Sequence, residues 1–369
     1  MLGPRPLAVP SLFFLLSSGY IPSSKISRPL NQRRFLIYRA DRVGDVVLTL
    51  PVVGLIRNTF PGAEITFFLR SYTRELVAEY PGVSGVILAD RNGRVRPFDD
   101  LLLDVRQGGF DAAVHVFPRP AQAWLSYRAK IPVRVGTAFR WYSWLYNRWV
   151  WDHRKTGDLH EAVYNIRLLR KLGVSVPDSV RPSLPVPAAY RQAALNTARR
   201  LGILENDRVV ALHPGSGGSA RDWDPSQFSQ LSRELSAKGF RPVITGAQEE
   251  RQLVEQVVAG SNGSAVAAAG AFSLMELAAF LQSCSVVVSN STGPMHIAAA
   301  VGTPLVGLFP PIAAASARRW GPLGDRTMTF TPDAAKCPLC KGGDCQSNVC
   351  MRQITVTEVL GAVETLTSR

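Results

Sequence analysis

The sequence predicts an α/β protein with two doubly wound domains that face each other across a central cleft. Short apolar runs alternate with amphipathic segments, a proline-rich stretch interrupts this alternation midway, and the same alternation then restarts. Alternation of strands and helices at this spacing is typical of parallel sheets. The 369 residues are enough for two such domains, each with its own core.

The first half alternates predicted strands and helices from residue 33 onward. Pro51 stands inside an early helical stretch, where it either kinks that helix or starts a second one, because proline is tolerated only in a first turn. We assign 33–180 to an N-terminal domain. Its predicted strands are 35–38, 64–69, 85–88 and 112–116, and its predicted helices include 73–79 and 98–105.

A linker with four prolines covers 174–189, too many for a continuous helix or strand. We assign 181–369 to a C-terminal domain that ends in a final helix. Ligands of open α/β sheets bind at the carboxyl ends of the strands, so both domains are expected to turn their binding loops toward the cleft. The predicted strands are 208–212, 242–245, 286–289 and 305–308, and the predicted helices are 225–238, 249–258, 273–282 and 293–301.

Residues 1–32 precede the first predicted strand and contain an apolar run at 11–16 that is too short to span a bilayer. We expect a disordered leader or an over-extended start site, with a peripheral membrane anchor and a signal peptide as alternatives. The whole chain carries 42 Lys and Arg against 28 Asp and Glu, a net charge of +14. Such a surplus favours anionic partners, and the absence of a basic tail argues against nucleic acid.

Asp45 is the first candidate for chemistry. The stretch 38–46 reads YRADRVGDV, so a strand ends, a glycine permits a tight turn and a carboxylate stands at the start of a helix. Such an aspartate is either a helix N-cap or a general base at the mouth of the cleft. Arg39, Arg42 and the helix dipole would keep this carboxylate ionised near neutral pH.

A small-residue loop in the second half suits a phosphate group. The stretch 212–223 reads LHPGSGGSARDW, and Ser216 and Gly217 offer a hydroxyl and backbone N–H groups there. Arg221 adds a guanidinium that can hold phosphate oxygens bidentately. The alternative is a flexible loop with a surface arginine.

A second polar turn, 288–296, reads VSNSTGPMH and leads from a strand into a helix whose first turn holds His296. Free N–H groups at such a helix start attract an anion such as a diphosphate, and the alternative is a well-capped helix with a core histidine. Glu249, or its neighbour Glu250, follows a strand–glycine turn and either binds ribose hydroxyls or is a solvated acid.

Three ordered stretches resemble glycosyltransferase family 9, whose best-known members are ADP-heptose:lipopolysaccharide heptosyltransferases. No GxGxxG follows the first strand, and no GxxxxGK[ST] or GxSxG is present, which argues against a dehydrogenase, a P-loop NTPase and an α/β hydrolase. The resemblance covers 34–366. Its stretches are RADRVGDVVLTLP, HPGSGGSARDW and NSTGPMHIAAAVGTPLVGLF.

This resemblance implies a GT-B fold of two facing Rossmann-like domains, the first for the acceptor and the second for a nucleotide-sugar. It implies an inverting transfer without metal or cofactor, in which Asp45 deprotonates the acceptor hydroxyl. The implied partners are an ADP-sugar and an anionic lipopolysaccharide-core lipid, with the enzyme in the cytoplasm and peripheral to the inner membrane. The residues implied at the donor are Ser216, Gly217, Arg221, Glu249, Ser291, Thr292, Gly293 and His296.

Two positions depart from the family pattern. Members commonly carry aspartate where this chain has Ser291, so a carboxylate that could accept from a sugar hydroxyl is missing, which bears on the identity of the sugar. Members often carry lysine where this chain has Arg221, and the positive charge is kept.

The stretch 127–155 is dense in aromatic and cationic residues. Arginine and tryptophan together suit an interface where anionic head groups meet acyl chains, and the alternative is a partly exposed helix whose aromatics pack on the sheet. The expected acceptor-binding residues are Arg39, Arg128, Arg134 and Arg140.

Four clustered cysteines lie in 337–350, whereas Cys284 belongs to an apolar helix end and is expected in the core. The cluster could hold a structural metal ion, form disulfides or stay as free thiols, and disulfides are not expected in the cytoplasm. The alternative functions are a nucleotide-sugar epimerase of GT-B architecture and a non-enzymatic module that binds metal or nucleic acid. The clustered residues are Cys337, Cys340, Cys345 and Cys350.

Overall fold

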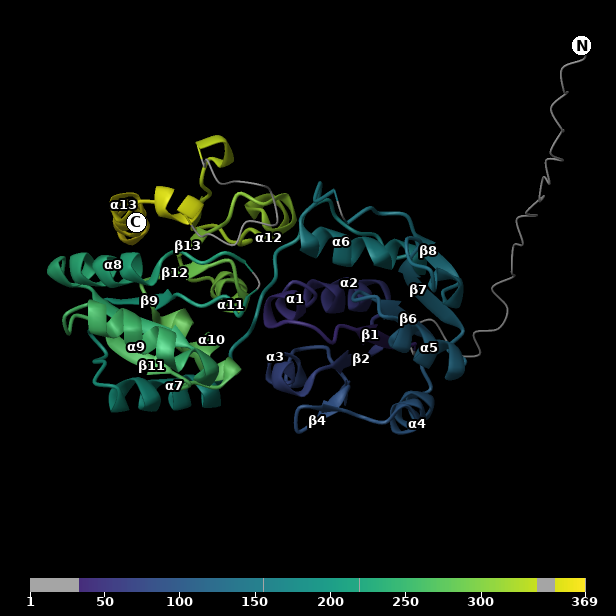
Figure 1. Cartoon of the computed structure of the whole chain (residues 1–369). Coiled ribbons are helices and arrows are strands. Elements are labelled where there is room, and N and C mark those ends of the chain that lie inside the picture. The colour runs from purple at the N-terminus through teal and green to yellow at the C-terminus, as the bar shows by residue number, and fades with distance from the viewer. Residues whose placement is uncertain (1–32, 155, 219, 337–348, 369) are drawn as a thin grey trace, which may run out of the picture.

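Two parallel sheets, one in each half of the chain, form the framework of the protein (Figure 1). The computed structural model describes residues 33–154, 156–218, 220–336 and 349–368. The first sheet contains β1 (Arg34–Tyr38), β2 (Glu64–Leu69), β3 (Gly85–Leu88), β6 (Ala112–His115), β7 (Val133–Thr137) and β8 (Arg148–Val150). The second contains β9 (Val209–His213), β10 (Arg241–Gly246), β11 (Val266–Ala269), β12 (Val286–Asn290), β13 (Leu305–Leu308) and β14 (Thr327–Phe330).

Both sheets have the same topology. Their orders are β3-β2-β1-β6-β7-β8 and β11-β10-β9-β12-β13-β14, and the first strand of each half pairs in parallel with two neighbours. This order is the doubly wound arrangement, in which a crevice forms where the strand order reverses beside the first strand. The predicted fold class is therefore confirmed.

Helices connect the strands in both halves. Pro51 begins α2, so the second of the two expectations for this proline is confirmed. The helices of the first half are α1 (Val43–Val47), α2 (Pro51–Thr59), α3 (Glu75–Ala78), α4 (Phe98–Gly108), α5 (Pro120–Arg128) and α6 (Glu161–Arg167). Those of the second half are α7 (Ala188–Arg200), α8 (Pro225–Ala237), α9 (Arg251–Gly260), α10 (Leu274–Ser283), α11 (Gly293–Ala300), α12 (Ala317–Trp320) and α13 (Val356–Thr367).

Shorter elements complete the connections, and the expected linker has no helix or strand from 174 to 187. An antiparallel pair joins β4 (Asp90–Arg91) and β5 (Arg94–Val95). The 3-10 helices are η2 (Ser71–Thr73), η3 (Ser143–Leu145), η4 (Leu168–Leu172), η5 (Gln248–Glu250), η6 (Ala313–Ala315), η7 (Ala334–Lys336) and η9 (Val349–Gln353).

The central strands are apolar because both of their faces are covered. Every residue of β9 and β12 is buried, as is all of β1 after Arg34. Continuous apolar runs are the expected signature of such strands. The start of α10 is fixed by Ser273, whose side chain accepts from the Glu276 N–H while the Glu276 carboxylate accepts from Ser273 N–H at 2.8 Å.

The stretch 127–155 is not a helix, contrary to one of its two interpretations. After α5 ends it forms β7, η3 and β8, which extend the first sheet to its edge. These two strands were not predicted, and neither were β11 and β14. All four are only three to five residues long, and β8 places Arg148 and Trp149 on an exposed surface, so no apolar run marks it.

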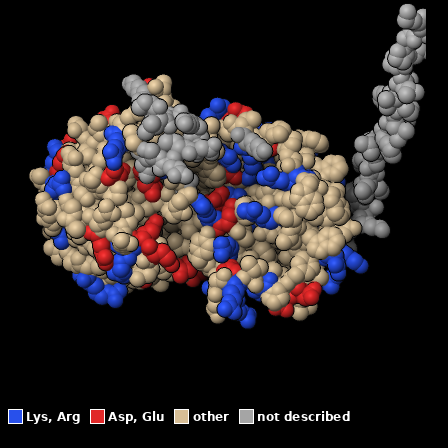
Figure 2. Space-filling view, viewed as in Figure 1, with Lys and Arg blue, Asp and Glu red and all other residues tan. Residues whose placement is uncertain are grey.

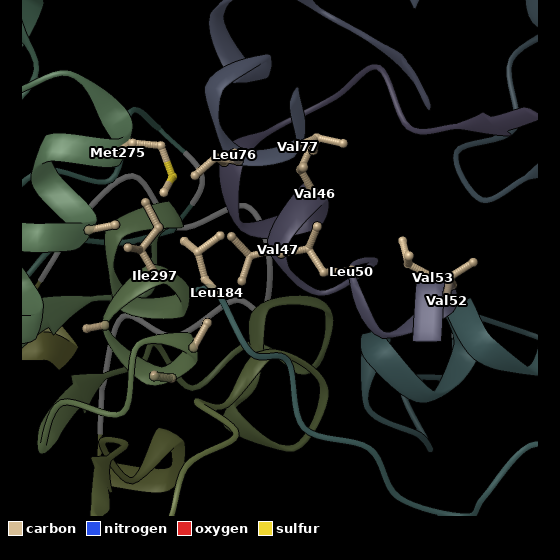
Figure 3. Close-up of a cluster of buried hydrophobic side chains, with 14 of the residues drawn as sticks. Val46, Val47, Leu50, Val52, Val53, Leu76, Val77, Leu184, Met275 and Ile297 are labelled. Carbon is tan, nitrogen blue, oxygen red and sulfur yellow. The ribbon is translucent and has the colours of Figure 1, made fainter. Parts of the chain in front are cut away.

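One apolar cluster joins the two halves (Figure 3). Val46 and Val47 of α1 and Leu76 of α3 lie opposite Met275 of α10 and Ile297 of α11, and all five are almost fully buried. Burying one such side chain contributes about 1.5–3 kcal/mol, so this shared cluster stabilises the contact between the halves.

Two glycines allow α1 and α11 to approach closely within this contact. A Cβ on Gly44 would lie 2.5 Å from Cδ2 of His296, and a Cβ on Gly293 would lie 2.8 Å from Cβ of Val43. Neither position has room for a side chain. The helix that carries Asp45 therefore lies directly against the helix that carries His296.

Among the described residues, no helix combines the length and the apolarity needed to cross a membrane. The expectations for residues 1–32 concern a segment outside the described residues.

We predict that Gly44→Ala lowers the free energy of unfolding by about 1–3 kcal/mol, because the added methyl group overpacks a buried contact. Gly54→Ala is the matched control: it lies in α2, and its added Cβ would meet no atom within 4 Å beyond its chain neighbours and the backbone of its own helix. This control should be neutral or stabilise the protein by up to about 1 kcal/mol. Urea unfolding measures both, and equal stabilities for the two variants would contradict the packing argument.

Candidate functional site

A large cavity of about 1130 Å³ lies at the carboxyl edge of the first sheet. The turns that follow β1, β2, β3 and β6 line it, as expected for a doubly wound sheet. Arg319 and Trp320 of α12 complete its wall from the second half of the chain. Seven arginines and four carboxylates line the cavity, and Figure 2 shows acidic and basic side chains meeting where the two halves join.

Asp45 is held at the edge of this cavity by a buried arginine. The Arg39 side chain is only 1% exposed, and its Nη2 is paired with Oδ1 of Asp45. Its Nε donates to the backbone oxygen of Asp45 at 3.0 Å, and Thr49 Oγ1 donates to the same oxygen at 2.8 Å. Asp45 is not the N-cap of α1, because Arg42 occupies that position. The alternative interpretation of Asp45 as a helix cap is therefore wrong.

Burial raises the pKa of Asp45, and Glu161 raises it further, whereas Arg39, Arg42 and Arg154 act in the opposite direction. The sequence predicted the effects of Arg39 and Arg42 on this pKa, but it did not predict that Asp45 is buried. A raised pKa brings the carboxylate closer to the neutral range in which a general base works best.

Asp41 and Glu161 share Arg39 and Arg154, but their pKa values shift in opposite directions. Burial raises the pKa of Asp41 to about 7, with Arg39 opposing and Asp45 and Glu161 adding to the rise. The pKa of Glu161 is lowered, because three arginines overcome the effect of burial. Asp41 Oδ1 lies 3.2 Å from Arg39 Nε without accepting a hydrogen bond, since that N–H is directed at the Asp45 backbone.

A smaller cavity of about 180 Å³ lies between the two halves and also includes Asp45 in its lining. Arg42 lines both cavities. The turn before α11 and the first turn of α11 contribute Ser291, Thr292, Gly293 and His296 to the lining. The structure therefore brings together, across the interface, residues that the sequence had placed in two separate motifs.

His296 is neutral in this position. It is 5% exposed, and burial lowers its pKa to about 3, with His160 adding to the decrease. Its Nδ1 has no hydrogen-bond partner. A neutral imidazole can offer one N–H donor but no net charge.

The small-residue loop after β9 is anchored to the end of β12. Asn290 Nδ2 donates to Pro214 O at 2.6 Å, and Asn290 Oδ1 accepts from Trp223 N at 3.0 Å. Gly217 has a positive φ of 55°. Ser216 hydrogen-bonds Asp222, whose pKa burial raises to about 6, and Oδ1 of Asp222 is buried without a partner.

The remaining expected donor residues surround this loop but do not line the two cavities described above. Arg221 Nη1 lies 3.7 Å from Sγ of Cys350. Glu249 is exposed, whereas Glu250 turns toward the loop: its Oε2 lies 3.8 Å from His213 Nε2 and accepts from Ala247 N at 2.8 Å. Glu250 is thus the better placed of the two acids.

Two of the four expected acceptor arginines, Arg39 and Arg140, line the large cavity. Arg39 is bound to Asp45 there, whereas Arg128 lies over Trp124 on an exposed face. Arg134 donates to Leu145 O at 2.8 Å and Ile131 O at 2.6 Å. These backbone bonds commit its guanidinium to the connection around η3, and Arg134 does not line the large cavity. Arg140 is exposed and lines the cavity.

The cysteine cluster is described only at Cys350, which is buried, and Cys337, Cys340 and Cys345 lie outside the described residues. Within the described part of the chain, no group of three His, Cys, Asp or Glu side chains could hold a metal ion. Cys284 is buried, as expected.

Several residues of the site were missed by sequence reasoning. Glu161 and Arg154 lie far along the chain from Asp45, and Arg319 and Trp320 come from the other half. No local pattern marks them, because a glutamate at a helix start usually faces solvent. Arg42 and Asp41 lie in the same motif as Asp45, and this proximity in the sequence was the only signal for them.

Comparisons with known proteins agree on one family. The profile of glycosyltransferase family 9 (heptosyltransferase) matches residues 101–348. Lipopolysaccharide heptosyltransferase 3 of Escherichia coli is 25% identical over 88% of this chain and 96% of its own. A family 9 glycosyltransferase of Veillonella parvula has a TM-score of 0.79 at 22% identity, covering 92% of this chain and 98% of its own. E. coli ADP-heptose heptosyltransferase II has a TM-score of 0.74 at 20% identity, covering 91% and 99%.

We predict that Asp41→Asn removes a pH-dependent loss of stability. The folded protein binds the Asp41 proton more tightly than the unfolded chain, so the contribution of this group to stability falls as pH rises from about 4 to about 7. The variant should gain more than about 1 kcal/mol relative to the wild type between pH 5 and pH 8.

Urea unfolding at the two pH values measures this difference, with the exposed Asp99→Asn as the control for the substitution itself. A wild-type-to-variant difference that is the same at both pH values would rule out a raised pKa for Asp41.

Proposed function

Because the chain belongs to glycosyltransferase family 9, we propose that it moves a heptose from an ADP-sugar to an anionic acceptor of the lipopolysaccharide inner core. The proposed transfer inverts the anomeric carbon and uses no metal. The supporting relatives include lipopolysaccharide heptosyltransferases 2 and 3 of E. coli. The E. coli heptosyltransferase WaaC, a structural neighbour with a TM-score of 0.68, was solved with ADP.

The position of Asp45 is the observation that carries the proposal. Its carboxylate stands between the large cavity in the first half and the smaller cavity beside α11. An acceptor in the large cavity and a donor anchored at α11 would meet at this residue. Base and leaving group would then lie on opposite sides of the reacting carbon, which is the arrangement that inversion requires.

The proposed step balances as a single displacement. Asp45 takes the proton of an acceptor hydroxyl, and the hydroxyl oxygen forms a bond to the anomeric carbon. The bond between that carbon and the diphosphate oxygen breaks, and its electron pair leaves with ADP. Holding both reactants at one carboxylate contributes to catalysis because it removes the cost of their encounter from the reacting step.

Charge that develops on the diphosphate needs donors that are in place before the reaction. The first turn of α11 offers backbone N–H groups at Thr292 and Gly293, and His296 can add one neutral N–H. Since His296 carries no charge, Arg42 is the cation that the smaller cavity provides. Ser216, Gly217, Arg221 and Glu250 are the proposed contacts for the rest of the nucleotide.

An exposed aromatic and basic surface supports a membrane-bound acceptor. Trp141, Trp144 and Trp151 are 79%, 60% and 67% exposed. In 117–155 the only acidic residue is Asp152, which pairs with Arg167 at 3.2 Å. Arg140 belongs to this surface and also lines the large cavity, so a lipid held there would lie near the site. We place the enzyme at the cytoplasmic face of the inner membrane.

We predict that Asp45→Asn lowers kcat by about 10²- to 10⁴-fold, because the acceptor hydroxyl loses its base. Donor affinity should change little. ADP release from ADP-heptose with Kdo-lipid A or a heptosylated acceptor measures the rate, and calorimetry measures donor binding. Full turnover by the variant with unchanged binding would show that Asp45 is not the base.

The same assay distinguishes the alternatives. A screen of ADP-, UDP-, GDP- and dTDP-sugars tests the identity of the donor. The screen is needed because this chain has Ser291 where family members commonly carry aspartate. Conversion of the sugar without any acceptor would indicate the epimerase reaction, which family membership does not favour.

We predict that Trp141→Ser combined with Trp151→Ser weakens binding to vesicles that contain anionic phosphatidylglycerol by about tenfold or more, because two large apolar side chains no longer enter the interface. Leu204→Ser, at a position 63% exposed in the second half, is the control. Co-sedimentation with vesicles measures the binding, and equal binding by the double variant and the control would argue against this surface.

A further inference from the structure

The segment around α12 belongs to the second half of the chain but is fastened to the first. It lies beside α6 (Figure 1). Glu161 Oε2 accepts from Arg319 Nη2 at 3.1 Å and from Arg319 Nε at 3.3 Å. Next to it, His160 Nε2 lies 2.8 Å from the carbonyl oxygen of Gly321.

The protonation of His160 follows from its two bonds. Its Nδ1 accepts from Ala162 N at 3.1 Å, so the proton of a neutral ring is on Nε2 and is donated to Gly321 O. Burial lowers the pKa of His160, in agreement with a neutral ring. Two consecutive residues at the start of α6 therefore bind α12 and the residue that follows it.

The other oxygen of Glu161 faces the base. Glu161 Oε1 accepts from Arg154 Nη1 at 2.5 Å and lies 3.9 Å from Arg39 Nη2, the nitrogen that pairs with Asp45. The side chain of Glu161 is only 3% exposed. One buried carboxylate thus connects the arginine that holds Asp45 to the arginine that closes the cavity from the second half.

We propose that Glu161 is a positioning residue for the transfer: one oxygen fixes the Arg39–Asp45 pair, and the other docks α12 so that Arg319 and Trp320 complete the acceptor cavity. The kinetic part of this inference rests on the proposed function, whereas the docking part does not. Because both oxygens belong to one carboxylate, the base and the cavity wall are set in place together.

Two variants separate these roles. Glu161→Gln keeps the shape of the side chain and removes its charge. Asp45 is faced by Arg39, Asp41 and Arg42 from the turn after β1, by Arg154, by Glu161 from α6, and by His296 across the smaller cavity. Loss of the negative charge on Glu161 should move the acid limb of the kcat/KM profile to lower pH.

Arg319→Gln removes the contact between α12 and Glu161 and leaves the contacts of Glu161 with Arg154 and Arg39 in place. Arg319 is not among the groups that shift the pKa of Asp45, so the acid limb should stay in place while the acceptor KM rises about tenfold. Arg318→Gln is the matched control. The Arg318 side chain is exposed, and its replacement removes only a pairing with Asp158 at 3.8 Å.

Hydrogen exchange measured by mass spectrometry tests the docking without any substrate. Amides of 313–321 should exchange about tenfold faster in Glu161→Gln and Arg319→Gln than in the wild type or Arg318→Gln. Unchanged exchange in both variants would overturn the docking, whether or not the protein transfers a sugar. Should Glu161→Gln fail to fold, Arg319→Gln and His160→Ala still decide this part.

The pH profile tests the other role. An unmoved acid limb in a folded, active Glu161→Gln would overturn the positioning of the base. A wild-type protein that transfers no sugar with any donor of the screen would contradict the proposed function, and the exchange data would still decide whether Glu161 docks α12.

Discussion

The close packing of α1 against α11 is the constraint on which the rest of the site depends. Gly44 and Gly293 leave no room for side chains, so the turn with Asp45 and the turn with Ser291 to His296 meet across the interface. The apolar cluster behind them, with Val47 and Ile297 in its centre, keeps the two helices in contact. A functional site assembled from two halves needs such an apolar contact, because polar groups alone would be solvated when the halves separate.

Sequence and structure agree wherever the relevant physics is local. Strand–helix alternation is set by side-chain periodicity, so the doubly wound class and the central strands could be predicted. Asp45 and the turn at Thr292 stand at strand ends, and such turns place side chains at a sheet edge in any doubly wound fold. The short strands β7, β8, β11 and β14 were missed because three to five residues with charged or small side chains carry little periodic signal.

The rest of the site depends on burial and on contacts between distant residues. Glu161 and Arg319 are 158 residues apart, and nothing in either local sequence indicates that they meet. Arg39 was expected to bind the acceptor, and the sequence did not predict that its side chain is only 1% exposed and paired with Asp45. Likewise, the sequence left open whether His296 belongs to an anion site or to the core, and only the structure shows that it is buried and that burial lowers its pKa.

The uneven sharing of arginines among three carboxylates is consistent with a site that holds both an anchoring carboxylate and the proposed base. Arg154, Arg319 and Arg39 converge on Glu161, so its pKa falls despite burial and it keeps its charge. Arg39 lowers the pKa of both Asp41 and Asp45, but burial together with the negative charge on Glu161 raises the pKa of both. A carboxylate that must accept a proton during each turnover benefits from this shift, because a base with a very low pKa accepts protons poorly. Burial is the main cause of the raised pKa of Asp45, and Glu161 adds to it, so the anchoring carboxylate supports the proposed role of its neighbour as a base.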